Sequence, residues 1–167
     1  MASLFEVAFT EPSAGWIGLR VTAEGVLFDD SFSHIYPSLE QLCGALCDAI
    51  AGVQSRRVTL LLAPAELELV ISPVDSETAH LAADLYSDRR RFPGVRSSRL
   101  FEFRAPPSAI ALSFWRALRR LQTYLPMSDF EREWREPFPA GAMASLTSVL
   151  KTATHNGTSW VSGCGRS

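Results

Sequence analysis

The stretch WIGLRVTAEGVLFDDSFSHIYPSLEQLCGALCDAIAG, residues 16–52, contains both kinds of hydrophobic periodicity found in folded proteins. Over residues 16–23 apolar residues alternate with small or polar ones, and this period of two predicts a strand with one buried face. A tight turn at Glu24-Gly25 then leads into a second expected strand over 26–36. The first part of the stretch therefore predicts sheet.

The second part of the stretch changes to the period of a helix. Ser38 is the expected N-cap, Gln41 follows three residues later as a capping-box partner, and Gly52 is the stop signal. The apolar stripe at helical spacing consists of Leu39, Leu42, Cys43, Leu46 and Ile50. Because Cys43 lies within this stripe, we expect it to be buried and inert rather than a redox or metal-binding residue.

The rest of the chain repeats these two patterns. Further strands are expected at 4–10, 57–64, 65–73, 78–86 and 98–105. A second amphipathic helix is expected over 106–125, ended by Pro126. The elements together predict an α+β fold, with a mostly antiparallel sheet of six to seven strands and the two main helices packed on one face.

The length of 167 residues suits a single domain. We expect that domain to cover residues 1–139. Residues 140–167 are expected to form a C-terminal extension, with a short helix over 142–153 followed by a weakly ordered tail.

Composition and motifs argue against several classes of protein. Hydrophobic residues make up 47% and charged residues 20% of the chain, as in soluble globular proteins, and no apolar run reaches the roughly 18 residues of a membrane helix. The N-terminus lacks the basic start of a secretory signal, so we expect a cytoplasmic protein with no membrane partner. The three cysteines have no framework spacing, and nucleotide, zinc and nucleophile-elbow motifs are absent, so no cofactor and no metal are expected.

The sequence SDRRRFPGVRSSR, residues 87–99, concentrates positive charge between two expected strands, with Pro93-Gly94 as its turn signal. Its arginines are Arg89, Arg90, Arg91, Arg96 and Arg99. A nucleic-acid site usually joins basic residues with several aromatic platforms on a basic protein. Here the pI is about 5.9 and the run holds one aromatic residue, so nucleic acid is disfavoured. The remaining interpretations are a solvated hairpin loop and a docking point for an acidic protein partner.

Two groups of residues are candidates for acid–base or ligand chemistry. Asp30, His34 and Tyr36 share one side of the expected strand over 26–36, although Asp30 and His34 lie roughly 13 Å apart by backbone rise. Glu66 and Glu68 share one strand face, and a carboxylate pair can supply a general acid and a general base. An alternating strand also places two glutamates in solvent in this way, which is the reading we favour.

The order of elements and the motifs SFSHIYPSLEQLCGALCDAIAG, VTLLLAPAELELVIS, FEFRAPP, SFWRALRRL and EREWREPFP carry a further inference. Over residues 16–139 this layout resembles small bacterial α+β domains encoded beside polymorphic-toxin loci, many of which are regarded as immunity proteins. The resemblance implies a non-catalytic protein-binding domain that neutralises a partner toxin, and it assigns no functional residue. The alternative is a small enzyme or ligand-binding module with a cleft near Asp30, His34 and Tyr36.

Overall fold

The computed structural model describes residues 5–158, which form seven strands and four helices. The strands are β1 (Phe5–Phe9), β2 (Trp16–Ala23), β3 (Val26–Ser33), β4 (Arg56–Leu61), β5 (Glu66–Pro73), β6 (Ala79–Tyr86) and β7 (Ser97–Ala105). The helices are α1 (Ser38–Ala51), α2 (Pro107–Tyr124), α3 (Met127–Trp134) and α4 (Ala140–Thr158). The α+β class, the seven expected strands and both expected main helices are confirmed. The strand expected over 26–36 is shorter, however: it ends at Ser33, so His34 and Tyr36 lie in the turn that follows and do not share a strand face with Asp30.

The strands form two antiparallel sheets and not the single sheet that we predicted. One sheet has the order β1-β2-β3 and the other the order β4-β5-β6-β7. Strands β3 and β4 lie close together but do not pair, and the chain forms α1 between them. A strand shows the same alternating burial whether the strands form one sheet or two. The period-two pattern of the sequence therefore does not reveal that β3 and β4 are unpaired.

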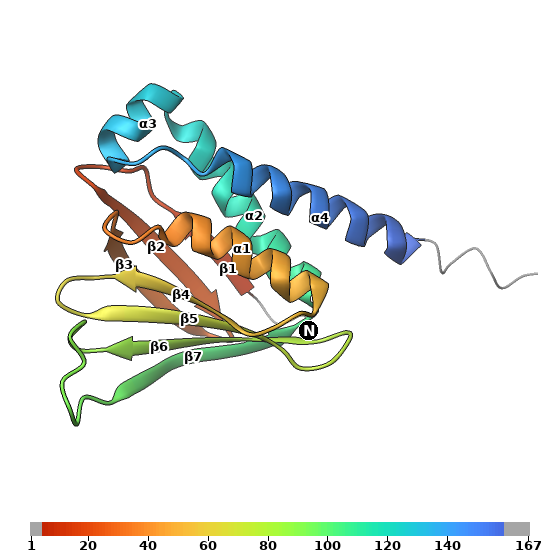
Figure 1. Cartoon of the computed structure of the whole chain (residues 1–167), viewed down its shortest axis with the longest axis horizontal. Coiled ribbons are helices and arrows are strands. Elements are labelled where there is room, and N and C mark those ends of the chain that lie inside the picture. The colour runs from red at the N-terminus through yellow and green to blue at the C-terminus, as the bar shows by residue number, and fades with distance from the viewer. Residues whose placement is uncertain (1–4, 159–167) are drawn as a thin grey trace, which may run out of the picture.

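The helices are also distributed differently from the prediction of two main helices on one face. Helix α1 packs on β4 and β5, α2 packs on β1, and α4 lies against both α1 and α2 (Figure 1). Each sheet is thus covered by a different helix, and α4 packs against both of these helices. No helix within residues 5–158 combines the length and apolar character needed to cross a membrane.

Aromatic contacts connect the layers into one core. The rings of Phe5 on β1 and Phe103 on β7 stack 4.7 Å apart and join the two sheets. Phe32 on β3 meets Trp134 of α3 edge to face at 5.5 Å. The short helix α3 therefore belongs to the core, with both Phe130 and Trp134 buried.

The C-terminal helix is longer than the expected helix over 142–153. It runs over Ala140–Thr158, and Met143, Leu146 and Leu150 are buried in the same hydrophobic core as the strands. The first half of the expected extension is therefore packed as part of the main body. The expectation of a weakly ordered tail falls largely on residues 159–167, which lie outside the described residues.

Helix α1 begins without the predicted capping box. The residue at the N-cap position is Pro37, and no side chain caps the helix. The Ser38 hydroxyl instead donates to the carbonyl of Thr59 on β4 at 2.5 Å, and the Gln41 amide oxygen accepts from the Thr59 N–H at 3.2 Å. The two polar side chains thus fasten α1 to the edge of the four-stranded sheet. The predicted stop at Gly52 is confirmed, because this residue adopts the left-handed conformation of a helix C-cap.

Candidate functional site

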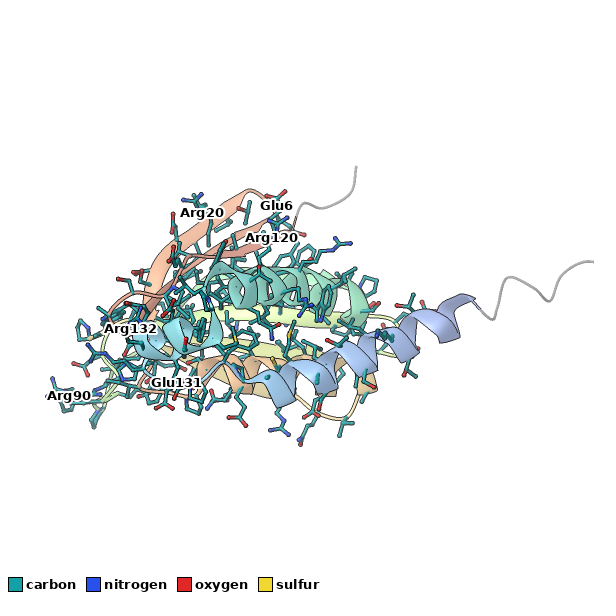
Figure 2. The ribbon with its side chains drawn as sticks, turned by 90° about the horizontal axis from the view of Figure 1, so that it is seen from above. Glu6, Arg20, Arg90, Arg120, Glu131 and Arg132 are labelled. Atoms are coloured by element: carbon teal, nitrogen blue, oxygen red, sulfur yellow. The ribbon has the colours of Figure 1, made fainter. Side chains whose placement is uncertain are left out.

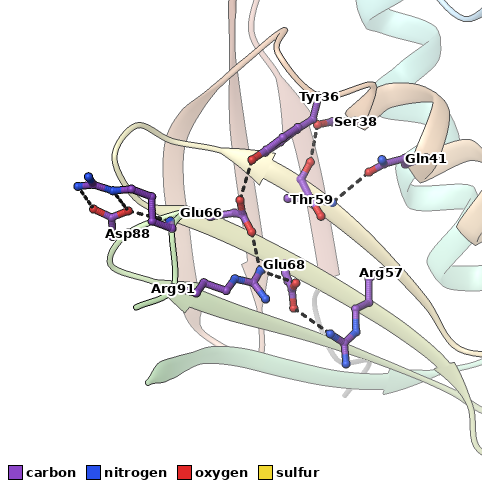
Figure 3. A network of polar contacts seen from close by, with 10 residues as sticks. Tyr36, Ser38, Gln41, Arg57, Thr59, Glu66, Glu68, Asp88 and Arg91 are labelled. Carbon is purple, nitrogen blue, oxygen red and sulfur yellow. Dashed lines mark hydrogen bonds and ion pairs between the residues drawn. The ribbon is translucent and has the colours of Figure 1, made fainter. Parts of the chain in front are cut away.

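The four-stranded sheet carries its charged residues on the face opposite the core, which we call the outer face. Leu67, Leu69 and Ile71 of β5 are buried in the core, so the alternating Glu66 and Glu68 belong to the outer face. Cross-strand register places further polar residues beside them on the same face: Arg57, Thr59, Asp84, Tyr86, Arg99 and Glu102. This face meets the arginine-rich loop that joins β6 to β7 (Figure 3).

Glu66 and Glu68 are not in solvent, and our prediction for them was wrong. Each is only 5% exposed, because the guanidinium of Arg91 covers both carboxylates. Arg91 Nη2 lies 2.5 Å from Glu66 Oε1 and 2.5 Å from Glu68 Oε1 (Figure 3). The hydrogen bond that Arg91 donates to Glu68 is the leading cause that raises the pKa of Arg91, so this arginine remains charged.

Three other side chains complete the network around this ion pair. The Tyr36 hydroxyl donates to Glu66 Oε2 at 3.0 Å, and Arg57 Nη1 lies 3.8 Å from Glu68 Oε2. The Arg91 guanidinium also stacks on the Tyr86 ring, 3.8 Å from its centroid. Burial, followed by the hydrogen bond to Glu66, raises the pKa of Tyr36, so its proton stays on the phenol.

This arrangement suits anchoring better than acid–base catalysis. All four carboxylate oxygens of Glu66 and Glu68 have a partner, and the two negative charges are matched by those of Arg91 and Arg57. A general acid or base needs an oxygen within reach of a substrate proton. The network instead fixes Arg91, and it holds this residue at a φ of 46°, a left-handed conformation that is unfavourable for a non-glycine residue.

The loop next to Arg91 is held by contacts of its own. Asp88 Oδ1 accepts from the Arg90 backbone N–H at 2.8 Å, and the Asp88 carboxylate also receives the Arg90 guanidinium at 3.1 and 3.2 Å. The hydrogen bond from the Arg90 side chain is the leading cause that lowers the pKa of Asp88. The guanidinium of Arg90 lies over the Phe92 ring at 4.8 Å, and the N–H of Arg89 donates to the Pro64 carbonyl in the turn between β4 and β5.

The five arginines of the stretch divide into two groups. Arg89, Arg90 and Arg96 are exposed in the loop, as expected for a hairpin connection, and Phe92 among them is 52% exposed. Arg91 contradicts the expectation of a solvated side chain, because it is anchored on Glu66 and Glu68. Arg99 lies on β7 and not in the loop, where it pairs with Asp84 and Glu102.

The alternative trio is only partly brought together. His34 and Tyr36 line a cavity of about 410 Å³ between the start of α1 and the segment joining α3 to α4. Asp30 does not line it, because it remains exposed on β3. The hydroxyl of Tyr36 is already bound to Glu66, and His34 Nδ1 lies 3.3 Å from the Gly15 carbonyl oxygen.

Gly15 allows this close approach of His34. Its φ is 84°, and a Cβ atom at this position would lie 2.7 Å from His34 Nδ1. The Gly15 N–H also donates to the carbonyl of Glu133 at the end of α3, and the His34 ring packs edge to face on Trp134. His34 is therefore an element of packing between β3 and α3.

The cysteine prediction can be examined for two of the three thiols. Cys43 is fully buried on α1, as predicted, and burial raises its pKa to about 12. Cys47 is partly exposed, and Cys164 lies outside the described residues. Among residues 5–158 no three His, Cys, Asp or Glu side chains lie close enough to hold a metal ion.

Sequence reasoning missed the anchor because its members are distant along the chain. Arg91 is 25 residues from Glu66 and 23 from Glu68, and Tyr36 is 30 residues from Glu66. Two glutamates on an alternating strand give no local signal of the arginine that will cover them. Comparison of the chain with protein-family models, curated proteins and solved structures gave no match.

Proposed function

We propose that this protein is a non-catalytic protein-binding domain of the immunity type, which neutralises a partner toxin. The loop at 87–96 is the part that docks on an acidic surface of that partner. The observation that supports this most directly is the anchoring of Arg91 on the buried pair Glu66 and Glu68. A loop that serves only to connect two strands has no need of such an anchor.

The anchor matters because a rigid loop loses less conformational entropy on binding. Arg89 is tied to Pro64 through its backbone, and Arg90 is tied to Asp88 and stacked on Phe92. Arginines and exposed aromatic rings are enriched among the residues that dominate protein interfaces. The loop thus presents a preformed group of three exposed arginines and one phenylalanine.

An acidic protein suits this loop better than a nucleic acid does. The protein has a net charge of −2, and Asp88 lies within the loop itself. Binding to phosphate would have to overcome the negative charge of the body. An acidic patch of limited size on a protein would contact only the loop, so it would not be repelled by the negative charge of the body.

The proposal is tested with the product of the reading frame that lies next to this gene. We expect it to bind, and we expect the triple variant Arg89→Ser, Arg90→Ser, Arg96→Ser to associate more slowly and with a weaker dependence on salt. Surface plasmon resonance over a series of salt concentrations measures both effects. Arg104→Ser, which removes an exposed arginine from β7, is the matched control and should associate at the wild-type rate.

Two results would contradict the proposal. One is an unchanged association rate in the triple variant. The other is binding of mixed-sequence DNA or RNA that weakens steeply with salt, through counterion release, and disappears in the triple variant.

The cavity lined by His34 and Tyr36 supports a second candidate, a small ligand-binding module. Its volume of about 410 Å³ lies in the range of small-molecule sites. A fragment screen followed by amide chemical shifts tests it, with shifts expected in the segment 34–40 and at Trp134. Fragments that shift only residues elsewhere would contradict it.

A further inference from the structure

A second surface lies between α2 and α4, at the opposite end of the molecule from the arginine-rich loop. Figure 2 shows Arg90 at one end and the C-terminal end of α4 at the other. Between the first half of α2 and the second half of α4 there is a groove of about 600 Å³. We call it the α2/α4 groove, and its main apolar lining residues are Pro106, Ala109, Leu112, Trp115 and Leu150.

Trp115 gives the groove a fixed wall. Its indole Nε1–H donates to Thr147 Oγ1 on α4 at 2.9 Å, and the Thr147 hydroxyl donates to the Met143 carbonyl. The ring is therefore held between the two helices. An apolar groove with a positioned indole is the kind of surface that receives the apolar face of a helix.

The rim of the groove is basic. Lys151 of α4 lines the groove itself, and the other side of Trp115 borders a hollow lined by Arg116, Arg119 and Arg120. Within residues 5–158 none of these four cations forms an ion pair, and Arg119 bonds only the neutral Gln122.

Most arginines elsewhere in residues 5–158 form an ion pair, although Arg89, Arg96, Arg104 and Arg135, like the rim, do not. Seven arginines elsewhere have a carboxylate within ion-pair distance: Arg20, Arg56, Arg57, Arg90, Arg91, Arg99 and Arg132. The first turn of α2, which opens onto the groove, also contains no acidic residue. Glu6 of β1 shares a hollow with Arg116 and Arg120 but is not within ion-pair distance of either. The groove is therefore apolar at its centre and has no acidic residue in its own lining, and Glu6 is a carboxylate that borders the rim on the side of β1.

We infer that the α2/α4 groove binds an acidic amphipathic helix of another protein. The apolar face of that helix lies on Leu112, Trp115 and Leu150, and its acidic side chains meet Lys151 and the arginines of α2. From Pro106, which precedes α2, to Trp115 the helix axis spans about 14 Å, which accommodates about two and a half turns of a bound helix. This surface is separate from the arginine-rich loop, so the inference does not depend on the proposed function.

The test uses a labelled peptide of about four turns, with leucines at positions i, i+3, i+4 and i+7 and glutamates at the remaining positions. Two control peptides replace the glutamates with lysines or the leucines with serines. Fluorescence anisotropy with the full chain should show saturable binding of the first peptide alone. Amide chemical shifts should change at residues 108–115 and 147–154.

Variants of the protein locate the site. Lys151→Glu combined with Arg119→Glu should weaken binding at least roughly tenfold, because it reverses the charge of the rim. Both residues are exposed, so the melting temperature should be retained. Arg89→Glu combined with Arg90→Glu, in the other surface, is the matched control and should leave peptide affinity unchanged.

Four outcomes would overturn the inference. They are no binding at millimolar peptide, equal binding of the lysine peptide, chemical shifts confined to other residues, and a groove already filled. The last is detected in two ways. Sedimentation would show a dimer that Leu112→Asp dissociates, or a chain ending at Thr158 would bind the peptide when the full chain does not.

Discussion

At the scale of single residues, the Arg91 guanidinium binds both Glu66 and Glu68. We therefore expect the removal of Arg91 to lower the free energy of unfolding more than the removal of the other loop arginines. Arg91→Met leaves two neighbouring carboxylates buried without their common cation. Removing one partner of a buried ion pair is strongly destabilising, and since Arg91 is 32% exposed we expect a loss of about 2–4 kcal/mol in the free energy of unfolding. Urea denaturation measures this loss.

The neighbouring Arg90→Met is the control for that experiment, because Arg90 is exposed and pairs with Asp88 at the surface. It should keep the wild-type midpoint. Adding Glu66→Gln and Glu68→Gln to Arg91→Met should recover part of the lost stability, since the unpaired charges are removed as well. If Arg91→Met and Arg90→Met behave alike, the loop is not anchored in the way described.

Cys43 makes stability depend on alkaline pH. Burial raises its pKa from an ordinary value of 9.0 to about 12. Above pH 9 the thiol ionises in the unfolded chain but not in the folded one, so the unfolded state is favoured as pH rises towards 12. The free energy of unfolding of the wild type should therefore fall relative to Cys43→Ala by up to about 1.4 kcal/mol per pH unit above pH 9.

Thiol labelling gives an independent check on Cys43. In the native protein at neutral pH, peptide mapping by mass spectrometry should find Cys47 modified before Cys43, because Cys47 is partly exposed. Rapid labelling of Cys43 would show that this face of α1 is accessible to solvent and does not pack on the sheet.

At the scale of the element, Ser38 connects α1 to β4 and does not cap the helix. Its hydroxyl donates to the Thr59 carbonyl, so Ser38→Ala should cost about 1 kcal/mol, the usual contribution of such a hydrogen bond. Ser38→Asp separates the two roles. An aspartate here suits the first turn of a helix but has no proton to donate, and its carboxylate would be buried facing the Thr59 carbonyl, so it should not restore stability.

Thermal unfolding of the two Ser38 variants measures this difference. A Ser38→Asp protein as stable as wild type would mean that capping outweighs the bond to the strand. Ser38→Thr, which keeps the hydroxyl, is the conservative control.

At the scale of the whole molecule, the two sheets and their helices depend on α4. The residues Met143, Leu146 and Leu150 complete the core formed by α1 and α2. A chain ending at Pro139 exposes that apolar surface, and we expect it to lose the cooperative thermal transition. Differential scanning calorimetry of this chain tests whether residues 1–139 fold alone.

A graded version keeps the test informative if the shortened chain aggregates. Leu146→Ala should cost about 2–5 kcal/mol, the range for a fully buried leucine, whereas the exposed Ser148→Ala should cost less than about 0.5 kcal/mol. A Leu146→Ala protein as stable as wild type would show that α4 contributes little to the core.

The sequence by itself determined the strands, the two main helices and the class of the fold, but not the helix α3. Strand β2 and helix α1 were predicted to within a residue, because burying one face imposes a period of two on a strand and of 3.6 on a helix. The loop at 87–96 was visible for a similar reason, since its Pro-Gly pair and its charges fit only a connection. These signals are local, so the folded state was not needed to see them.

Only the tertiary structure decided how the elements combine and which charges meet. The division into two sheets depends on whether β3 and β4 pair, and neither strand carries a residue that forbids pairing. Glu66 and Glu68 have the local sequence pattern of solvated residues. They are buried because Arg91 and Tyr36, which are distant along the chain, contact their carboxylates. Contacts between such distant residues follow from the packing of whole elements, which no local period encodes.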